Sequence, residues 1–268
     1  IKWIADLRDP WTDIYYYPIL QHSKISHRIN LNYERKVVKQ SDHIITVSDG
    51  LKNIFNSKIT DDINNKISII PNGFDPDDFK LKKDKDHDFF EIVYTGTMSE
   101  VYNPSSFIEI LGELSIKYEK IRLKIVGHVA DNIVKEINNY NIPFEYINHV
   151  PHSEITTHQL NADLLLLVIP DTEKAEGILT GKLFEYLATK NSIISIGCKH
   201  GDAAQIITKS GLGKAFNRTD KNQIKHFINL LINQDTETNH EINVKYIDQF
   251  SRSYQAEQVL NLINSKIA

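Results

Sequence analysis

The chain has 268 residues, of which 41% are hydrophobic and 25% charged, values typical of a folded globular protein with room for one large domain or two small ones. Its formal net charge of −4 argues against nucleic acid as the main partner. The single cysteine, Cys198, excludes an internal disulfide framework and fits a reducing cytoplasm, and no apolar run reaches the roughly 20 residues of a membrane-spanning helix.

The first part of the chain alternates apolar runs with helical spacing. Three buried strands are predicted at residues 1–7, 42–48 and 66–70, with one helix over 23–40 and another over 49–55 that Ser48 caps. The sequence opens inside a strand and has no initiator methionine. We therefore expect that the front of this domain is missing from the sequence.

The turn after the first strand, Arg8-Asp9-Pro10-Trp11, is the first candidate site. In open α/β sheets ligands gather at the carboxyl ends of the strands, so we expect the side chains of Arg8 and Asp9 to point into a crevice. A guanidinium there could bind a phosphate or an anionic acceptor through two parallel hydrogen bonds. The alternative is a structural Arg–Asp pair that caps the turn.

Two further features of this region have alternative interpretations. The run Tyr15-Tyr16-Tyr17 predicts a loop over the crevice, which either stacks against a sugar or packs against a missing segment. The helix over 23–40 is basic on one side, so it could lie on an anionic membrane surface, but we favour the commoner explanation of a solvated face. The basic residues are Lys24, Arg28, Arg35, Lys36 and Lys39.

The segment Pro71-Asn72-Gly73-Phe74-Asp75 predicts a hinge, because Asn-Gly permits a turn with positive φ. We place the first domain at 1–75, a polar linker at 76–88 and a second domain at 89–249. The second domain alternates strands and helices, which implies an α/β fold with a parallel sheet covered on both faces. Strands are expected at 89–96, 123–127, 144–150, 163–169 and 192–196, and helices at 104–118, 131–140, 154–160 (capped by Ser153), 181–188, 202–209, 220–234 and 255–266.

The stretch Thr180-Gly-Lys-Leu-Phe-Glu-Tyr-Leu-Ala188 follows a glycine-bounded loop and starts a helix near Gly181. Lys182 and Glu185 are three residues apart, so they share one face of that helix. The unpaired N–H groups of a helix start, with a lysine beside them, suit a diphosphate, and a carboxylate one turn deeper suits ribose hydroxyls. The alternative is a helix packed on a sheet, with both charged side chains merely solvated.

Four motifs in this order resemble group 1 (family 4) retaining glycosyltransferases of the GT-B fold: the Asp-Pro-Trp turn, the Pro-Asn-Gly-x-Asp hinge, the Gly-Lys-Leu-Phe-Glu-Tyr-Leu-Ala helix and the terminal helix. The resemblance implies two Rossmann-like domains with parallel sheets, the first one incomplete, and a terminal helix at 250–268 that crosses back to the first domain. It implies transfer of a sugar, without a metal or other cofactor, from a nucleotide-diphosphate sugar to a saccharide or lipid-linked acceptor. The biological task that fits is synthesis of a bacterial surface polysaccharide at the inner face of the cytoplasmic membrane.

The resemblance also implies roles for single residues. Asp9, with Arg8 in the place of the family's histidine, becomes the catalytic candidate, and Glu185 matches the family's ribose-binding glutamate. The family's other glutamate would fall at Gly177, and Glu176 stands one residue too early. Relatives also carry cations near Thr97, so phosphate binding rests here on Lys182 and helix N-termini. The donor-binding candidates are Gly96, Thr97, His152 (beside the nucleotide base), Glu176, Gly177, Leu179, Thr180, Gly181, Lys182 and Glu185.

No metal site is expected, because His149, His152 and His158 have no cysteines or clustered carboxylates beside them. Two other functions compete with sugar transfer. A GT-B sugar-nucleotide epimerase would need further acid/base residues at the cleft. A catalytically silent nucleotide-sugar-binding remnant or subunit is favoured by Arg8 in place of histidine and by the displaced Glu176, and transfer activity of the chain would exclude it.

Overall fold

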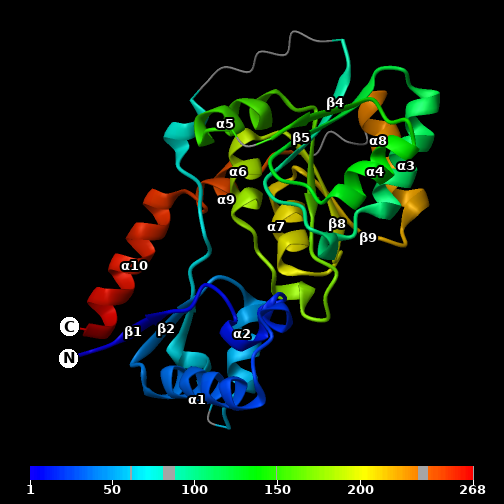
Figure 1. The fold of residues 1–268 in the computed structure, drawn as a ribbon. Coiled ribbons are helices and arrows are strands. Elements are labelled where there is room, and N and C mark those ends of the chain that lie inside the picture. The colour runs from blue at the N-terminus through cyan, green and yellow to red at the C-terminus, as the bar shows by residue number, and fades with distance from the viewer. Residues whose placement is uncertain (61, 81–87, 149, 235–240, 268) are drawn as a thin grey trace.

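The structure, a computed structural model, describes residues 1–60, 62–80, 88–148, 150–234 and 241–267 (Figure 1). Its strands form two separate sheets, and all strand pairs within them are parallel. We call residues 1–75 the N-terminal region and residues 88–249 the C-terminal region. Of the linker expected at 76–88, residues 81–87 lie outside the described residues.

The N-terminal region carries a three-stranded sheet in the order β1-β2-β3. Its elements are β1 (Ile4–Asp6), α1 (Lys24–Gln40), β2 (His43–Thr46), α2 (Asp49–Ser57) and β3 (Ile67–Ile69). Both helices begin at serine caps, whose hydroxyl oxygens accept hydrogen bonds from the N–H groups of Ser26 and Leu51. Two short 3₁₀ turns, Trp11–Asp13 and Tyr17–Leu20, lead from β1 to α1.

The C-terminal region carries a six-stranded sheet in the order β6-β5-β4-β7-β8-β9. Its elements are β4 (Phe90–Thr95), α3 (Ser105–Lys117), β5 (Ile121–Val126), α4 (Asp131–Asn139), β6 (Phe144–Ile147), α5 (His152–Asn161), β7 (Leu164–Val168), α6 (Gly181–Thr189), β8 (Ser192–Gly197), α7 (Asp202–Ser210), β9 (Gly213–Asn217), α8 (Lys221–Ile232) and α9 (Val244–Asp248). The strand order reverses between β4 and β7. In sheets of this type ligands bind outside the carboxyl ends of the two strands at the reversal.

Two apolar clusters cover the two faces of the larger sheet. Alternate residues of one strand belong to different clusters: Leu164 and Leu166 of β7 pack on one face, and Leu165 packs on the other. Such strands are buried on both sides, which explains the continuous apolar run that predicted β7.

Two sequence-based expectations for this region are wrong. The structure places Pro151 directly before α5, so Ser153 lies inside the helix and caps nothing. Proline has its φ already set for a helix start, and here φ is −57°. No strand was expected after 192–196, but Gly213 begins a further strand, β9, in which Phe216 is the one buried residue.

The chain crosses between the regions twice, and the two crossings are hydrogen-bonded to each other. The N–H of Phe74 donates to the carbonyl of Phe250 (2.9 Å), and the N–H of Arg252 donates to the carbonyl of Phe74 (2.8 Å). The positive φ expected at the hinge is absent from Asn72 and Gly73. Glycine is needed there because the two chain crossings approach each other closely: a Cβ on Gly73 would lie 2.4 Å from the Phe250 carbonyl oxygen.

The terminal helix α10 (Arg252–Ile267) runs from the second crossing back along the N-terminal region and ends beside the start of the chain (Figure 1). Burial is the main cause that lowers the pKa of His43 in β2, and the positive charge of Lys266 on α10 is the second. The end of α10 is therefore close to β2. No helix in the described part of the chain is both long and apolar enough to cross a bilayer.

Candidate functional site

The reversal point between β4 and β7 brings several of the predicted donor-binding residues together. Gly96 follows β4 with a φ of +101°, a conformation that favours glycine. A Cβ on Gly96 would lie 3.2 Å from the Nζ atom of Lys182, so the glycine turn and the first turn of α6 are in contact. Gly181, at the start of α6, is exposed, and apart from its chain neighbours and its own helix backbone no atom of the described residues lies within 4 Å of the place where its Cβ would be. A ligand can therefore approach this helix start closely.

Lys182 lies in an aromatic cage. Its Nζ donates a hydrogen bond to the Tyr94 hydroxyl (2.5 Å) and lies 3.9 Å from the centre of the Tyr94 ring and 5.7 Å from that of Tyr102. Burial lowers the pKa of Lys182 to about 7, and the Glu185 carboxylate opposes this shift. The ammonium is thus only partly charged near neutral pH, and an incoming anion would favour its charged form.

Glu185 is half-buried one turn further along α6. Its Oε2 accepts a hydrogen bond from the side-chain amide of Gln159 on α5 (2.7 Å). Its Oε1 accepts none from the described residues, so half of the carboxylate is available to a ligand. Gln159 was not singled out in the sequence, since nothing in an amphipathic helix marks one buried polar residue as a partner of another helix.

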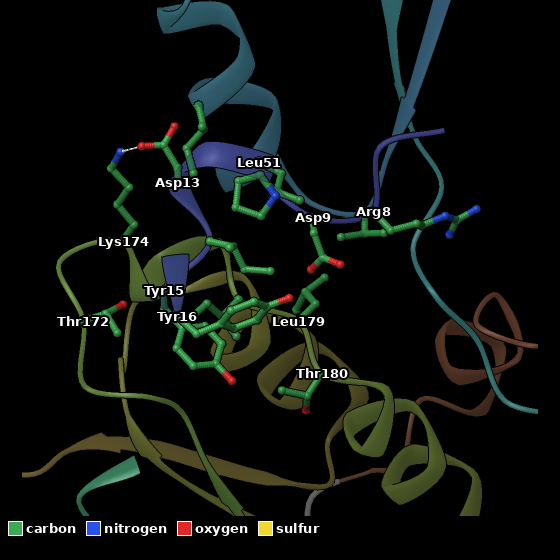
Figure 2. Close-up of a pocket in the computed structure, with 16 residues that line it drawn as sticks. Arg8, Asp9, Asp13, Tyr15, Tyr16, Leu51, Thr172, Lys174, Leu179 and Thr180 are labelled. Atoms are coloured by element: carbon green, nitrogen blue, oxygen red, sulfur yellow. Dashed lines mark hydrogen bonds and ion pairs between the residues drawn. The ribbon is translucent and has the colours of Figure 1, made fainter. Parts of the chain in front are cut away.

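A pocket of about 240 Å³ lies between the two regions, beside this cluster (Figure 2). Its walls combine the turn after β1, helix α2 and the loop before α6. Figure 2 shows the Asp9 carboxylate pointing into the pocket and the Arg8 guanidinium turned away from it. The lining residues are Arg8, Asp9, Pro10, Asp13, Ile14, Tyr15, Tyr16, Val47, Leu51, Ile54, Thr172, Lys174, Gly177, Ile178, Leu179 and Thr180.

The expectation that Arg8 points into the crevice is therefore wrong. Its guanidinium donates two hydrogen bonds to the carboxylate of Asp6 (2.7 and 3.0 Å). It also donates to the carbonyl of Ile70 and the side chain of Asn72 at the hinge. The Arg–Asp pair considered as the alternative exists, but its acid is Asp6 and not Asp9. Asp9 is exposed and has no hydrogen-bond partner among the described residues.

Gly177 forms a close contact between the two regions. A Cβ on Gly50 of α2 would lie 2.3 Å from the Gly177 Cα, and the Ser48 hydroxyl donates to the Gly177 carbonyl (3.0 Å). The N–H of Gly50 donates to the carboxylate of Asp202 on α7 (2.9 Å). Burial raises the pKa of Asp202. Gly177 and its neighbours Leu179 and Thr180 line the pocket, whereas the Glu176 side chain is exposed.

The remaining candidates lie at the margin of the cluster. Thr97 is exposed, and its carbonyl accepts a hydrogen bond from the Tyr94 hydroxyl (2.7 Å). His152 is exposed at the start of α5, where its Nε2 lies 3.4 Å from an Asp78 oxygen. His149 lies outside the described residues, and the described part of the chain holds no group of three or more His, Cys, Asp or Glu side chains suited to a metal.

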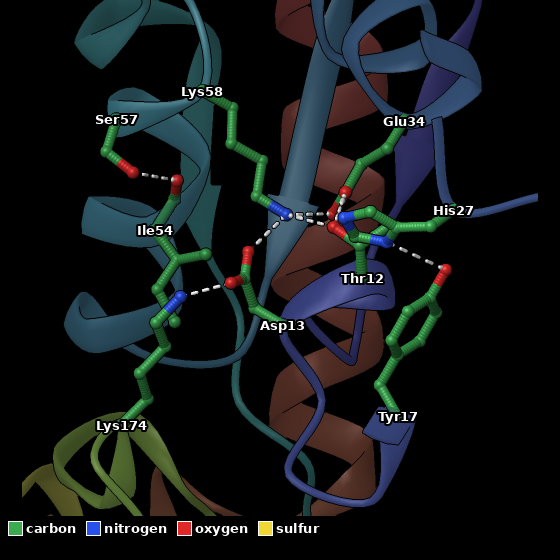
Figure 3. A network of polar contacts seen from close by, with 9 residues as sticks. All are labelled: Thr12, Asp13, Tyr17, His27, Glu34, Ile54, Ser57, Lys58 and Lys174. Carbon is green, nitrogen blue, oxygen red and sulfur yellow. Dashed lines mark hydrogen bonds and ion pairs between the residues drawn. The ribbon is translucent and has the colours of Figure 1, made fainter. Parts of the chain in front are cut away.

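A buried polar network holds the turn that forms one wall of the pocket (Figure 3). Lys58, directly after α2, contacts Glu34 of α1 and Asp13, each at 2.5 Å, and Thr12 donates to Glu34. Lys174 of the C-terminal region pairs with Asp13 from the other side. Burial raises the pKa of Asp13, but the hydrogen bonds from Lys174 and Lys58 outweigh it and lower the pKa overall.

Comparison with known proteins links the chain to glycosyltransferases. The sequence model of Glycosyltransferase Family 4 matches residues 7–78, which cover the N-terminal region from the end of β1 onward and the start of the linker. No curated protein sequence matches the chain.

Solved structures resemble the chain over nearly its whole length. Anabaena HepE in complex with UDP-glucose has a TM-score of 0.74 at 14% identity, with 98% of this chain and 72% of HepE covered. A mutant of S. aureus TarM in complex with fondaparinux, alpha-GlcNAc-glycerol and UDP has a TM-score of 0.67 at 14% identity, with 97% of this chain covered. WaaG, a glycosyltransferase involved in lipopolysaccharide biosynthesis, has a TM-score of 0.67 at 12% identity, covering 97% of this chain and 74% of WaaG.

The chain spans about half the length of TarM, with 50% covered. At these identities the likeness concerns the fold. The chain thus has the α/β architecture of GT-B glycosyltransferases, with two sheets of parallel strands, as the sequence predicted.

Proposed function

We propose that the chain belongs to a retaining, metal-independent glycosyltransferase that moves a sugar from a nucleotide-diphosphate sugar to a saccharide or lipid-linked acceptor. The observation that carries this proposal is the grouping of Gly96, Lys182 and Glu185 at the sheet reversal, next to the pocket that contains Asp9. The Family 4 match over residues 7–78 supports it from the other region.

In this proposal the diphosphate lies at the start of α6. The free N–H groups there and the ammonium of Lys182 stabilise the charge that develops on the leaving diphosphate in the transition state. Lys182 must move away from Tyr94 and Tyr102 to reach the phosphate. Electrostatic attraction between its ammonium and the negatively charged ligand would favour this movement. Glu185 accepts hydrogen bonds from the ribose.

The pocket suits the transferred sugar or the end of the acceptor. The hydroxyl oxygens of Thr172 and Thr180 are buried and have no partner among the described residues, and the Asp9 carboxylate is unpaired. Buried polar atoms of this kind normally find a partner. A sugar ring carries the hydroxyl groups that would satisfy them, and Tyr15 and Tyr16 provide aromatic surface beside it.

The biological part of the proposal is synthesis of a bacterial surface polysaccharide at the inner face of the cytoplasmic membrane. HepE was solved with UDP-glucose and WaaG acts in lipopolysaccharide biosynthesis, which motivates a UDP-sugar donor and a surface glycan. Ile25 and Ile29 of α1 are exposed beside Lys24 and Arg28, so in this proposal α1 is the helix that would contact an anionic membrane surface.

A catalytically silent nucleotide-sugar-binding subunit is the second candidate, because Arg8 is committed to Asp6 and the hinge and so cannot serve the reacting groups. An epimerase has less support. Apart from Asp9, the carboxylate and the amine that line the pocket belong to Asp13 and Lys174, and these two are paired with each other.

The test is calorimetric titration of the purified chain with UDP, GDP and their sugar conjugates, with and without EDTA. We expect one nucleotide to bind regardless of EDTA, and Lys182→Ala and Glu185→Ala each to weaken binding by about tenfold or more. Lys135→Ala, at an exposed position on α4, is the control that should bind normally. Absence of binding to every nucleotide would contradict the proposal. NMR of the reaction product then reports whether the anomeric configuration is retained.

A further inference from the structure

Behind Glu185 lies a buried polar network that the proposed roles do not yet explain. Gln159 is fully buried, and its amide nitrogen donates to Glu185 (2.7 Å) and to the hydroxyl of Thr95 (3.0 Å). Thr95 in turn donates through its N–H to the Tyr186 hydroxyl (3.0 Å). The network joins α5, the last residue of β4 and helix α6, so it connects the turn at Gly96 with the helix that carries Lys182 and Glu185.

From this arrangement we infer that Gln159 is a positioning residue, which orients the Glu185 carboxylate for recognition of the ribose hydroxyls. The inference rests on the proposed function, in which a nucleotide binds beside α6. Gln159 itself does not touch the ligand. It acts by occupying Oε2 of Glu185, so that Oε1 is the oxygen offered to the ribose.

The geometry of Gln159 supports such a role. An amide nitrogen carries two donor hydrogens, and each has one acceptor here, so the side chain cannot rotate without losing both bonds. The backbone is held as well, because the Asn191 amide donates to the carbonyls of Gln159 (2.8 Å) and Leu160 (2.9 Å). Glu185 is therefore bonded to a group that is itself fixed at both ends.

A purely structural explanation accounts less well for the residue. The Oε1 atom of Gln159 is buried and accepts no hydrogen bond from the described residues. An unsatisfied buried oxygen is destabilising, so an apolar side chain would fill this space at lower free energy if packing were its whole purpose. The donor function toward Glu185 is what an apolar residue could not supply.

The experiment uses calorimetry to compare the binding of UDP with that of 2′,3′-dideoxy-UDP, which lacks the two ribose hydroxyls. If GDP is the nucleotide that binds, GDP and 2′,3′-dideoxy-GDP are used instead. The variants are Gln159→Met, which keeps the size and removes both donors, and Gln159→Glu, which places an acceptor against Glu185. Thr156→Val, which removes a buried polar group of α5 that does not contact Glu185, is the matched control. Thermal unfolding of each variant shows whether it is folded.

We expect the wild-type chain to prefer the ribonucleotide by about tenfold or more. Gln159→Met should lose most of that preference while binding the dideoxy compound as the wild type does, Gln159→Glu should lose all of it, and Thr156→Val should keep it. A wild-type preference that survives in both Gln159 variants would overturn the inference while leaving the proposed function intact. Absence of nucleotide binding by the wild type would instead overturn the proposed function, and this inference with it.

Discussion

The two regions build the same kind of parallel sheet but fill their interiors with different groups. In the C-terminal region two apolar clusters cover both faces of six strands. In the N-terminal region a smaller cluster packs on three strands, and the carboxylate of Glu34 lies fully buried beside it. The N-terminal region also exposes large apolar side chains on α1 and the turn before it, such as Ile19 at 72% and Ile25 at 73%.

This difference shows how each region serves the proposed site. The apolar interior of the larger sheet fixes the donor-binding cluster, because Gly96, Lys182 and Glu185 belong to elements packed on that core. The charged interior of the smaller sheet fixes the turn that carries Asp9 and lines the pocket. The C-terminal region depends on the burial of apolar surface, and the N-terminal region depends on a few ion pairs.

The largest expected effect is that of Lys58→Met. It would leave Glu34 buried without its cation, which typically lowers the free energy of unfolding by about 3–5 kcal/mol. The Lys58 side chain is 7% exposed and that of Glu34 is 0% exposed, so water cannot compensate. Urea unfolding monitored by circular dichroism measures the loss.

The matched control is Lys124→Met in the larger sheet. Lys124 pairs with Glu91, but its side chain is 15% exposed and also reaches Glu145, so we expect a smaller loss. Equal losses in the two variants would contradict the contrast between the two interiors.

The next effect in size concerns the contact between the regions. Gly50→Ala would place a Cβ 2.3 Å from the Cα of Gly177, and relief of such overpacking typically costs about 1–3 kcal/mol. Gly181→Ala meets open space, so its thermal stability should be unchanged or slightly raised. Small-angle scattering should show the two regions further apart in Gly50→Ala but not in Gly181→Ala. An unchanged scattering curve for Gly50→Ala would mean that the glycine contact does not set the spacing of the two regions.

A smaller effect follows from the pKa of about 7 for Lys182. The free ammonium loses its proton above pH 7, while a bound diphosphate favours the charged form. Nucleotide affinity should therefore fall as the pH rises above 7, by at most about tenfold per pH unit, since one proton is taken up. Titrations at pH 8 in two buffers of different ionisation enthalpy detect that proton, and Lys182→Met should abolish the uptake. Identical heats for the wild type in both buffers would argue against the lowered pKa.

The smallest effect is expected for Lys174→Ala. Its ion pair with Asp13 is partly exposed, so the loss of stability should be about 0.2–1 kcal/mol and should shrink at high salt. Lys174 also helps to lower the pKa of Asp13. A carboxylate with a lowered pKa stabilises the fold above its unfolded pKa, and this contribution is lost as the pH falls through its folded pKa. Acid unfolding should thus begin at a slightly higher pH in the variant, whereas a loss as large as that of Lys58→Met would contradict this ranking.

The sequence predicted the elements well where local signals are strong. The apolar run of β7, the serine before α2 and the glycine that begins α6 are local signals, formed by residues that are neighbours in the chain. It did not predict β9, where Gly213, Lys214 and Asn217 carry little strand preference and pairing with β8 decides the structure.

The site was predicted less completely, since its contacts join distant segments. Lys182 and Tyr94 are 88 residues apart, and Gln159 and Glu185 are 26 apart. Arg8 was assigned to the crevice because its position after β1 is visible in the sequence, but its partner groups at Ile70 and Asn72 are not. Local pattern identifies which residues stand near the carboxyl end of a strand, and only the fold decides which way their side chains point.

The paired chain crossings at Phe74 and Phe250 limit how the molecule can move. Because the two crossings are hydrogen-bonded to each other, we expect them to act as one hinge point between the regions. Rotation about that point is then the relative motion that we expect. The contacts of Gly50 with Gly177 and of Asp13 with Lys174 join the two regions at the pocket, so we expect them to limit such rotation and to hold the pocket at its present width.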